Sequence, residues 1–288
     1  MDTDIIRDVR VKAYSPAERR WSTNYKSPRT PVFSLRVVSW NVDFMASNTA
    51  GRISCILHHL KDAVLTKSPK PSCILLQELD QDSFAAILAN DWVREHFAVT
   101  PPNTRRWCAS YGVATLVSRH ANILRAQMLQ FHRSTMGRTA LFVDVEMFVP
   151  GSHGERRVVR IANTHLESLP DGERARPAQL CAIADILRYE EVTGGGLVGG
   201  DMNMIGPADQ DIHELAGLVD ACDDPSAVTW GYQPPMRFPP GRLDRIFHVD
   251  GGLVVEPVKV IGKGLKTKNG AWASDHYGLM TTIQLASA

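Results

Sequence analysis

Short runs of apolar residues, many of them rich in β-branched side chains, recur along most of the chain and predict β-strands. The predicted strands cover residues 34–42, 72–78, 111–118, 139–147, 156–164, 196–198, 242–249, 253–261 and 277–285. The run at 72–78 is continuously apolar, as in a buried strand, whereas 139–147 alternates and predicts one wet face. The turn-like segment 150–154 implies that 139–147 and 156–164 pair antiparallel.

Apolar residues at helical spacing lie between some of these strands. Residues 48–66 carry Ile53, Ile56, Leu57 and Leu60 on one face, which predicts an amphipathic helix. Further helices are predicted over residues 80–90, 171–190 and 209–217. Helices combined with an antiparallel strand pair indicate an α/β protein and argue against a simple doubly wound nucleotide-binding fold.

The composition is that of an ordinary globular protein, with 288 residues, 44% of them hydrophobic and 22% charged. The formal net charge of +1 leaves any nucleic-acid site to a local patch. The five cysteines contain no Cys-x-x-Cys pair, which argues against a zinc site or a disulfide framework. Because the sequence has no membrane-spanning run and no signal-peptide pattern, we expect an intracellular protein in the nucleus, the cytoplasm or both.

The first 33 residues differ in character from the rest of the chain. They are mostly polar and include three prolines, which predicts an N-terminal leader without a core of its own, flexible or draped over the main domain. The folded domain is therefore expected to cover residues 34–288.

Chemically versatile side chains stand at the ends of six of the apolar runs. They are Asn41, Glu78, His165, Asp201 with Asn203, Asp244, and Asp275 with His276. For any one of them a turn is the commoner role, because Asp and Asn favour turns. A set that includes a Glu, two His and three Asp is better explained by one site at one edge of a two-sheet core. Its oxygen donors suit Mg²⁺ or Mn²⁺, and its histidines suit a phosphate partner.

The motifs that contain these residues resemble those of the endonuclease/exonuclease/phosphatase superfamily, in the same order and over residues 34–285. They are Trp40-Asn41, Leu76-Gln77-Glu78, Thr164-His165-Leu-Glu-Ser168, Gly200-Asp201-Met-Asn203, Leu243-Asp244-Arg-Ile246 and Ser274-Asp275-His276. The resemblance implies a four-layer α/β sandwich of two mainly antiparallel sheets packed face to face, with helices outside. It also implies that residues 34–288 form a catalytic domain that hydrolyses phosphate esters.

The resemblance assigns roles to the acidic and amide residues. Glu78 would bind the catalytic Mg²⁺, with Asn41 and Asp275 in or near the metal shell. Asp201 would align and deprotonate the attacking water, and Asn203 would contact the phosphate.

The same resemblance assigns roles to the two histidines. His276, oriented by Asp244, would contact a phosphate oxygen, and His165 would supply a further donor.

Finer details resemble the branch of the superfamily that hydrolyses 5′-phosphotyrosyl-DNA links. They are the segment 134–138, the Trp230 loop and Arg242 just before Leu243-Asp244. The implied partner is a DNA 5′ end that carries a tyrosyl adduct and is single-stranded near the site. Trp230 and Phe238 would stack on bases, while Arg138, Arg242 and the lysines of 259–268 would meet backbone phosphates. Alternatively, Trp230 packs in the core and does not stack on a base, and the lysines are simply exposed to solvent and do not bind phosphates.

Other functions stay open from the sequence. A general nuclease, an abasic-site endonuclease and a phosphatase would share these motifs, and so would a non-catalytic nucleic-acid-binding protein on this fold. We expect a monomer without a membrane association.

Overall fold

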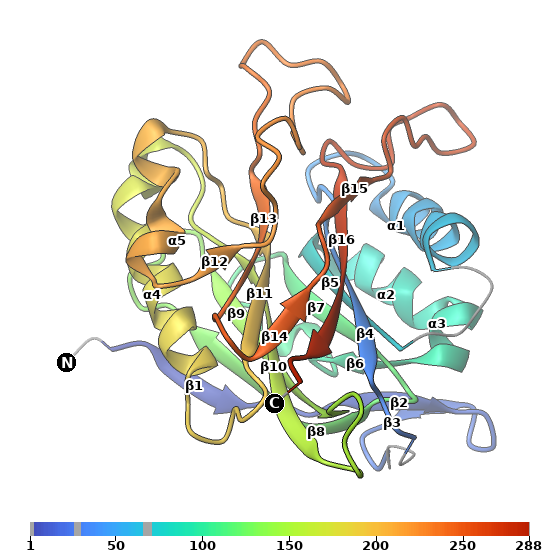
Figure 1. Cartoon of the computed structure of the whole chain (residues 1–288). Coiled ribbons are helices and arrows are strands. Elements are labelled where there is room, and N and C mark those ends of the chain that lie inside the picture. Colours follow the sequence, from blue (N-terminus) through green and yellow to red (C-terminus); the bar gives the residue numbers. More distant parts are fainter. Residues whose placement is uncertain (1–2, 26–29, 66–70, 288) are drawn as a thin grey trace.

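Two β-sheets packed face to face form the centre of a computed structural model that describes residues 3–25, 30–65 and 71–287 (Figure 1). In the described part of the chain, the first sheet runs in the order β1 (Ile5–Asp8), β8 (Asn122–Gln130), β9 (Thr139–Phe148), β10 (Arg156–His165), β11 (Gly196–Asp201), β13 (Asp244–His248) and β12 (Val219–Asp220). Its pairs are antiparallel except β10–β11, which is parallel.

The second sheet contains the strands that carry the first two predicted motifs. Its order is β14 (Leu253–Val255), β16 (Gly278–Leu285), β4 (Ser34–Asn41), β5 (Ser72–Leu79), β7 (Gly112–Ser118), β6 (Phe97–Thr100), β2 (Lys12–Ser15) and β3 (Arg20–Ser22), and β15 (Lys259–Ile261) also pairs with β16. Here β4–β5 is the parallel pair, so the carboxyl ends of β4 and β5 lie at one edge.

Helices cover the outer faces of both sheets (Figure 1). On one side lie α1 (Thr49–His59), α2 (Gln81–Ala89) and α3 (Asp91–His96), and on the other lie α4 (Ala175–Leu187) and α5 (Ile212–Leu215). A short π-helix covers Leu60–Val64, and short 3-10 helices cover Thr104–Arg106, Pro170–Arg174 and Pro207–Asp209. The predicted four-layer sandwich is therefore confirmed.

Alternation along the strands divides the apolar side chains between separate cores. On β4, Leu35 and Val37 pack between the two sheets, whereas Val38 and Trp40 pack under α1 and α2. A third cluster joins the first sheet to α4 and α5. Because these strands are covered on both faces, their sequences are almost continuously apolar up to the edge where the polar residues begin.

Several predicted elements differ in extent from the observed ones. The predicted strand 253–261 is two strands, β14 and β15, and the predicted helix 209–217 has only one α-helical turn at α5. The predicted last residue of the first helix, 66, lies outside the described residues. Strand β8 was not predicted, although it pairs along its length with β9.

The N-terminal segment is more ordered than the predicted leader. Strand β1 pairs with β8 at the edge of the first sheet, and β2 pairs with β6 at the edge of the second. Between them, Val9 and Val11 pack against the core that separates the sheets. Trp21 also docks, with its indole nitrogen donating to the Leu88 carbonyl at 3.0 Å. The segment therefore links the two sheets, while the domain boundary at residue 34 stays a prediction.

Deleting residues 1–22 should destabilise the whole sandwich, since it removes an edge strand from each sheet and uncovers Val9 and Val11. We expect a loss on the order of 3 kcal/mol in the free energy of unfolding, measured by chemical denaturation. A deletion of residues 1–3, which precede β1, is the control. Equal stability of the two truncated proteins would contradict this linking role.

Candidate active site

The predicted site residues converge where strands of both sheets end. Asn41 closes β4, and His165 and Asp201 close β10 and β11, where they face each other in register. Asp201 is also in register with Asp244 of β13. These residues are polar yet buried, and they contact one another, although Nε2 of His165 and Oδ1 of Asp244 lack a hydrogen-bond partner within the described chain.

Glu78 reaches the site through an irregularity in β5. The pairing with β7 shifts register between Leu76 and Leu79, and Glu78 has a positive φ of 57°. A left-handed conformation is costly for a residue with a side chain and is found mainly at functional positions. Here it accompanies a carboxylate next to Asn41.

A single amide joins two carboxylates that come from different sheets. Nδ2 of Asn41 donates to Oε1 of Glu78 at 3.1 Å and to Oδ2 of Asp201 at 2.9 Å. The backbone amide of Phe44 donates to the other Glu78 oxygen at 3.2 Å. Asn41 is therefore oriented with its nitrogen toward the carboxylates, and its Oδ1 accepts from the Asp43 amide.

The surroundings of the site disfavour the ionised form of its carboxyl groups and so raise their pKa values. Burial raises the pKa of Glu78 to about 7, and the neighbouring Asp201 and Asp275 add to the effect. Burial also raises the pKa of Asp201 and of Asp275. Glu78, His165 and Asp201 offer ligand atoms within 4.8 Å of one another, as do Asp201, Asp244 and His276. The carboxylate oxygens in these groups, from Glu78, Asp201 and Asp244, are the kind of donor that suits a hard cation.

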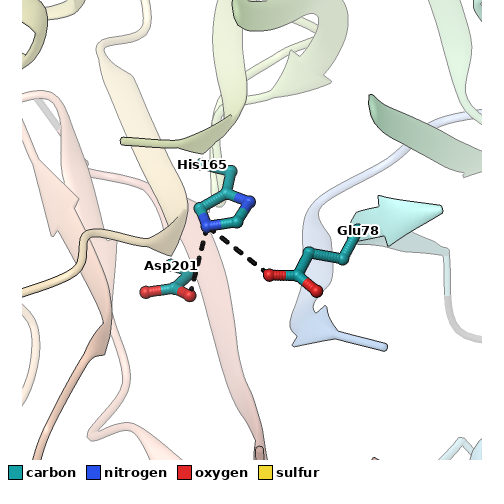
Figure 2. A group of neighbouring side chains, drawn as sticks. All are labelled: Glu78, His165 and Asp201. Carbon is teal, nitrogen blue, oxygen red and sulfur yellow. Dashed lines mark ion pairs between the residues drawn. The ribbon is translucent and has the colours of Figure 1, made fainter. Parts of the chain in front are cut away.

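His165 points between Asp201 and Glu78 (Figure 2), and its contacts fix it as a neutral hydrogen-bond donor. Nη1 of Arg138 lies 2.7 Å from its Nδ1, and because a guanidinium only donates, the ring proton must be on Nε2. That nitrogen has no hydrogen-bond partner among the described residues and lies 3.5 Å from Oδ2 of Asp201 and 3.8 Å from Oε1 of Glu78. Burial and the nearby Arg138 hold the pKa of His165 well below its usual value. A protonated Nε2 is not a metal ligand.

His276 has the opposite protonation. Burial disfavours its charge, but Asp244, Asp275 and Asp201 outweigh burial and hold its pKa well above the usual value. Its Nδ1 lies 2.7 Å from Oδ2 of Asp244, and its Nε2 lies 3.8 Å from Oδ2 of Asp201. An imidazolium therefore faces the carboxylates, oriented by Asp244 as predicted for this pair.

Asn203 is held by the loop that follows β10. Its φ is 49°, its Oδ1 accepts from Oγ of Ser168 at 2.8 Å, and its Nδ2 donates to the Leu166 carbonyl at 3.0 Å. Its backbone amide also donates to Oδ1 of Asp201 at 2.9 Å. One side-chain amide hydrogen has no protein acceptor within the described chain, so Asn203 keeps a donor for a ligand.

The residues predicted to bind substrate divide into buried and exposed ones. Arg138 is 5% exposed and its guanidinium contacts His165, so it orients that histidine, while its contact with backbone phosphate stays a prediction. Nη2 of Arg242 donates to Oδ2 of Asp220 at 3.0 Å, and Arg245 pairs with the same oxygen at 2.8 Å, so the phosphate contact of Arg242 stays a prediction.

Trp230 and Phe238, the two aromatic residues predicted to stack on bases, differ in exposure. The indole nitrogen of Trp230 donates to Oδ2 of Asp275 at 3.0 Å, so this tryptophan orients a carboxylate from a half-buried position. Phe238 is 54% exposed and stacks under the Arg237 guanidinium, so it stays a candidate contact for substrate. In the predicted lysine loop 259–268, Nζ of Lys266 lies 4.2 Å from the ring centroid of Trp272, which is a cation–π contact.

Some site residues were not identified from the sequence. Glu167 accepts from Ser134, Thr135 and Met136, and thereby orders the segment that carries Arg138. Its presence inside the Thr164–Ser168 motif was the available signal. Phe44 stacks on Tyr111 beside Glu78, with ring centroids 3.9 Å apart, and the sequence did not predict that pair because its two loops are distant in the chain.

A model of the Endonuclease/Exonuclease/phosphatase family matches residues 38–276. The chain belongs to this family, which confirms the resemblance carried by the six motifs. None of the helices in the described part of the chain has the length and apolarity that a bilayer crossing requires.

The chain is similar to a 5′-tyrosyl-DNA phosphodiesterase of Caenorhabditis briggsae, with 28% identity over 210 residues, 69% of this chain. It spans about half the length, 53%, of this curated relative. Among solved structures, D. rerio TDP2 complexed with single-strand DNA product has a TM-score of 0.69 at 20% identity and covers 87% of this chain and 99% of that one. Truncated Caenorhabditis elegans TDP2 has a TM-score of 0.66 at 22% identity, with coverage of 88% and 98%. These structures share the fold.

The metal-free protein should lose stability as Glu78 ionises. Because burial raises its folded-state pKa above the unfolded value of 4.5, its contribution is complete below about pH 4.5 and is lost as the pH rises through about 7. By pH 8 we expect the free energy of unfolding to fall by at most about 3 kcal/mol, measured by chemical unfolding with a chelator present. Glu78→Gln is the comparison, and an identical pH dependence of the two proteins would disprove the assignment.

Proposed function

We propose that the chain is a metal-dependent phosphodiesterase that hydrolyses the link between a tyrosine and the 5′-phosphate of DNA. The observation that carries the proposal is the pair of carboxylates, Glu78 and Asp201, joined by the Asn41 amide and flanked by two histidines of opposite protonation. The similarity to the tyrosyl-DNA phosphodiesterase of Caenorhabditis briggsae supports the choice of substrate.

The residues fit a hard divalent cation. Glu78 would hold it, with Asp275 in or near its shell, since both carboxyl groups are half-buried and His276 is the one charged partner that lowers the pKa of both. Oxygen donors favour Mg²⁺, with Mn²⁺ as the alternative. When bound, the cation supplies positive charge beside the phosphate and the leaving oxygen. Asn41 serves this site as the donor that ties Glu78 to Asp201.

Asp201 acts as the general base. It accepts a proton from water as the water oxygen bonds to phosphorus. The bond between phosphorus and the tyrosine oxygen breaks, and its electron pair leaves on the phenolate. Since a phenol has a pKa of about 10, the phenolate departs without a dedicated acid, and the products are a 5′-phosphorylated DNA end and the freed tyrosine.

Three donors would face the phosphate, from the end of β10 and from two loops. The Nε2–H groups of His276 and His165 and the free amide hydrogen of Asn203 donate to its oxygens as negative charge develops. Their own partners, Asp244, Arg138 and the Leu166 carbonyl, hold them in place before substrate binds.

The nucleic acid would approach along the exposed loop 232–240. Phe238 offers an exposed ring on which a base of a single strand can stack, and Arg237 adds a positive charge above it. Stacking tolerates any base, which suits a substrate defined by its 5′ adduct and not by its sequence.

Purified protein should release a 5′-phosphate end from a 5′-phosphotyrosyl oligonucleotide with Mg²⁺ and lose this activity with a chelator. Asp201→Asn should lower kcat by about 10³-fold, because the general base is removed. Parallel assays on nicked duplex, abasic duplex, RNA and inositol phosphate separate the related functions. Faster turnover of any of these than of the tyrosyl substrate would overturn the choice of substrate.

Phe238→Ala should raise KM for a single-stranded substrate by roughly 5- to 100-fold, which is the loss of one stacked base. The kcat value should stay near that of the wild type. Phe33→Ala is a matched control, because Phe33 is similarly exposed, at 49%, but precedes the opposite end of β4 from Asn41. Equal KM values for the two variants would remove Phe238 from the binding surface.

A further inference from the structure

A buried ion pair at the start of α4 joins two loops of the candidate site. Nε and Nη2 of Arg176 donate to the two carboxylate oxygens of Asp209, at 2.7 and 2.9 Å. Arg176 is 1% exposed and Asp209 is fully buried. A buried pair of this kind adds little net stability, because desolvation offsets the attraction, but its forked geometry fixes the relative position of what it connects.

The connected parts are the loops that hold Asn203. Nη1 of Arg176 donates to the carbonyls of Glu167 and Leu169, at 3.0 and 2.9 Å. Asp209 in turn accepts from the backbone amide of Gly206 at 2.9 Å. One guanidinium therefore ties the loop 166–170 to the loop 203–209.

Asn203 depends on both of these loops. It hydrogen-bonds Ser168 and the Leu166 carbonyl in the first loop while belonging to the second. Leu169, next to Ser168, has a φ of 65°, and such a conformation persists only where neighbouring contacts hold it. The Arg176 bond to its carbonyl is such a contact.

A second connection leaves α4 from the same face, three residues later. Gln179 accepts from the Glu167 amide at 2.9 Å and donates to its Oε2 at 3.0 Å. The same carboxylate receives Ser134 and Thr135, and Oγ of Ser134 accepts from the Arg138 amide at 2.7 Å. This chain of bonds ends at Arg138, whose guanidinium sets the tautomer of His165.

We propose that Arg176 and Gln179 are positioning residues that set two phosphate donors, Arg176 mainly through Asn203 and Gln179 mainly through His165, by routes that meet at Glu167. The inference rests on the proposed phosphodiesterase function. Neither residue touches the reacting atoms, so both act by holding a donor where the transition state needs it. Because misplacement of a catalytic group by about 1 Å costs about 10²-fold in rate, small displacements of these loops are enough to be measured.

Arg176→Lys keeps the positive charge but loses the fork, and it should lower kcat about 10- to 100-fold with KM and Mg²⁺ affinity little changed. Arg160→Lys is the matched control. Arg160 makes the same bidentate pair with Asp144, at 2.7 and 2.8 Å, and holds the Ile186 carbonyl at the opposite end of α4. It should lose comparable thermal stability and keep the wild-type kcat.

The two routes are separated by double variants. In an Asn203→Ala background Arg176→Lys should have little further effect on kcat, whereas Gln179→Met should still lower it about tenfold. In a His165→Ala background the pattern should reverse. Full additivity of Arg176→Lys with Asn203→Ala, or an equal loss of kcat in Arg160→Lys, would overturn the proposal.

Hydrogen exchange tests the positioning without turnover. Arg176→Lys should speed amide exchange in 166–170 and 203–209 relative to the segment around His276, and unchanged exchange there would refute the clamp. Absence of wild-type turnover on the tyrosyl oligonucleotide would instead count against the proposed function, and the exchange result would still decide whether Arg176 holds these loops.

Discussion

The site depends on the hydrogen bonds by which one amide, that of Asn41, holds two carboxylates from opposite sheets. The Asn41 amide donates to Glu78 and Asp201, two crowded carboxyl groups whose pKa values are both raised because ionising them side by side is unfavourable. The apolar core between the two sheets holds the sheet edges together, and with them the two carboxyl groups. The packing of the two sheets therefore also places the two carboxyl groups. A bound cation would reduce the electrostatic repulsion between them.

The protonation states of the two histidines, His165 and His276, are set by their hydrogen-bond partners. Arg138 forces the His165 proton to the nitrogen that faces the site, while Asp244 keeps His276 charged. Both rings then present an N–H toward the same carboxylates. An arginine in the role usually filled by a carbonyl or carboxylate makes His165 a permanently neutral donor, which no inspection of the histidine alone would reveal.

The sequence predicted the strands that end in site residues because a long apolar run followed by a charged side chain is a strong local signal, as at Glu78 and Asp201. It did not predict β8, whose apolar and polar residues do not alternate cleanly, or the pairing of residues 5–8 with it, which depends on contacts distant along the chain. Arg138 and Arg242 were expected to meet phosphates because a sequence does not reveal buried partners. Spacing identifies which side chains gather, whereas orientation follows from tertiary contacts.

Glu78, Asn203 and Leu169 share a left-handed backbone, with φ of 57°, 49° and 65°. Each such conformation costs about 1–3 kcal/mol for a residue other than glycine, and Glu78 also carries a desolvated carboxylate. Selection for thermal resistance alone would therefore favour glycine or apolar replacements at these positions, giving a hardier scaffold without its chemistry. Directed evolution of this protein needs an activity screen in every round, since melting temperature by itself rewards the loss of the site.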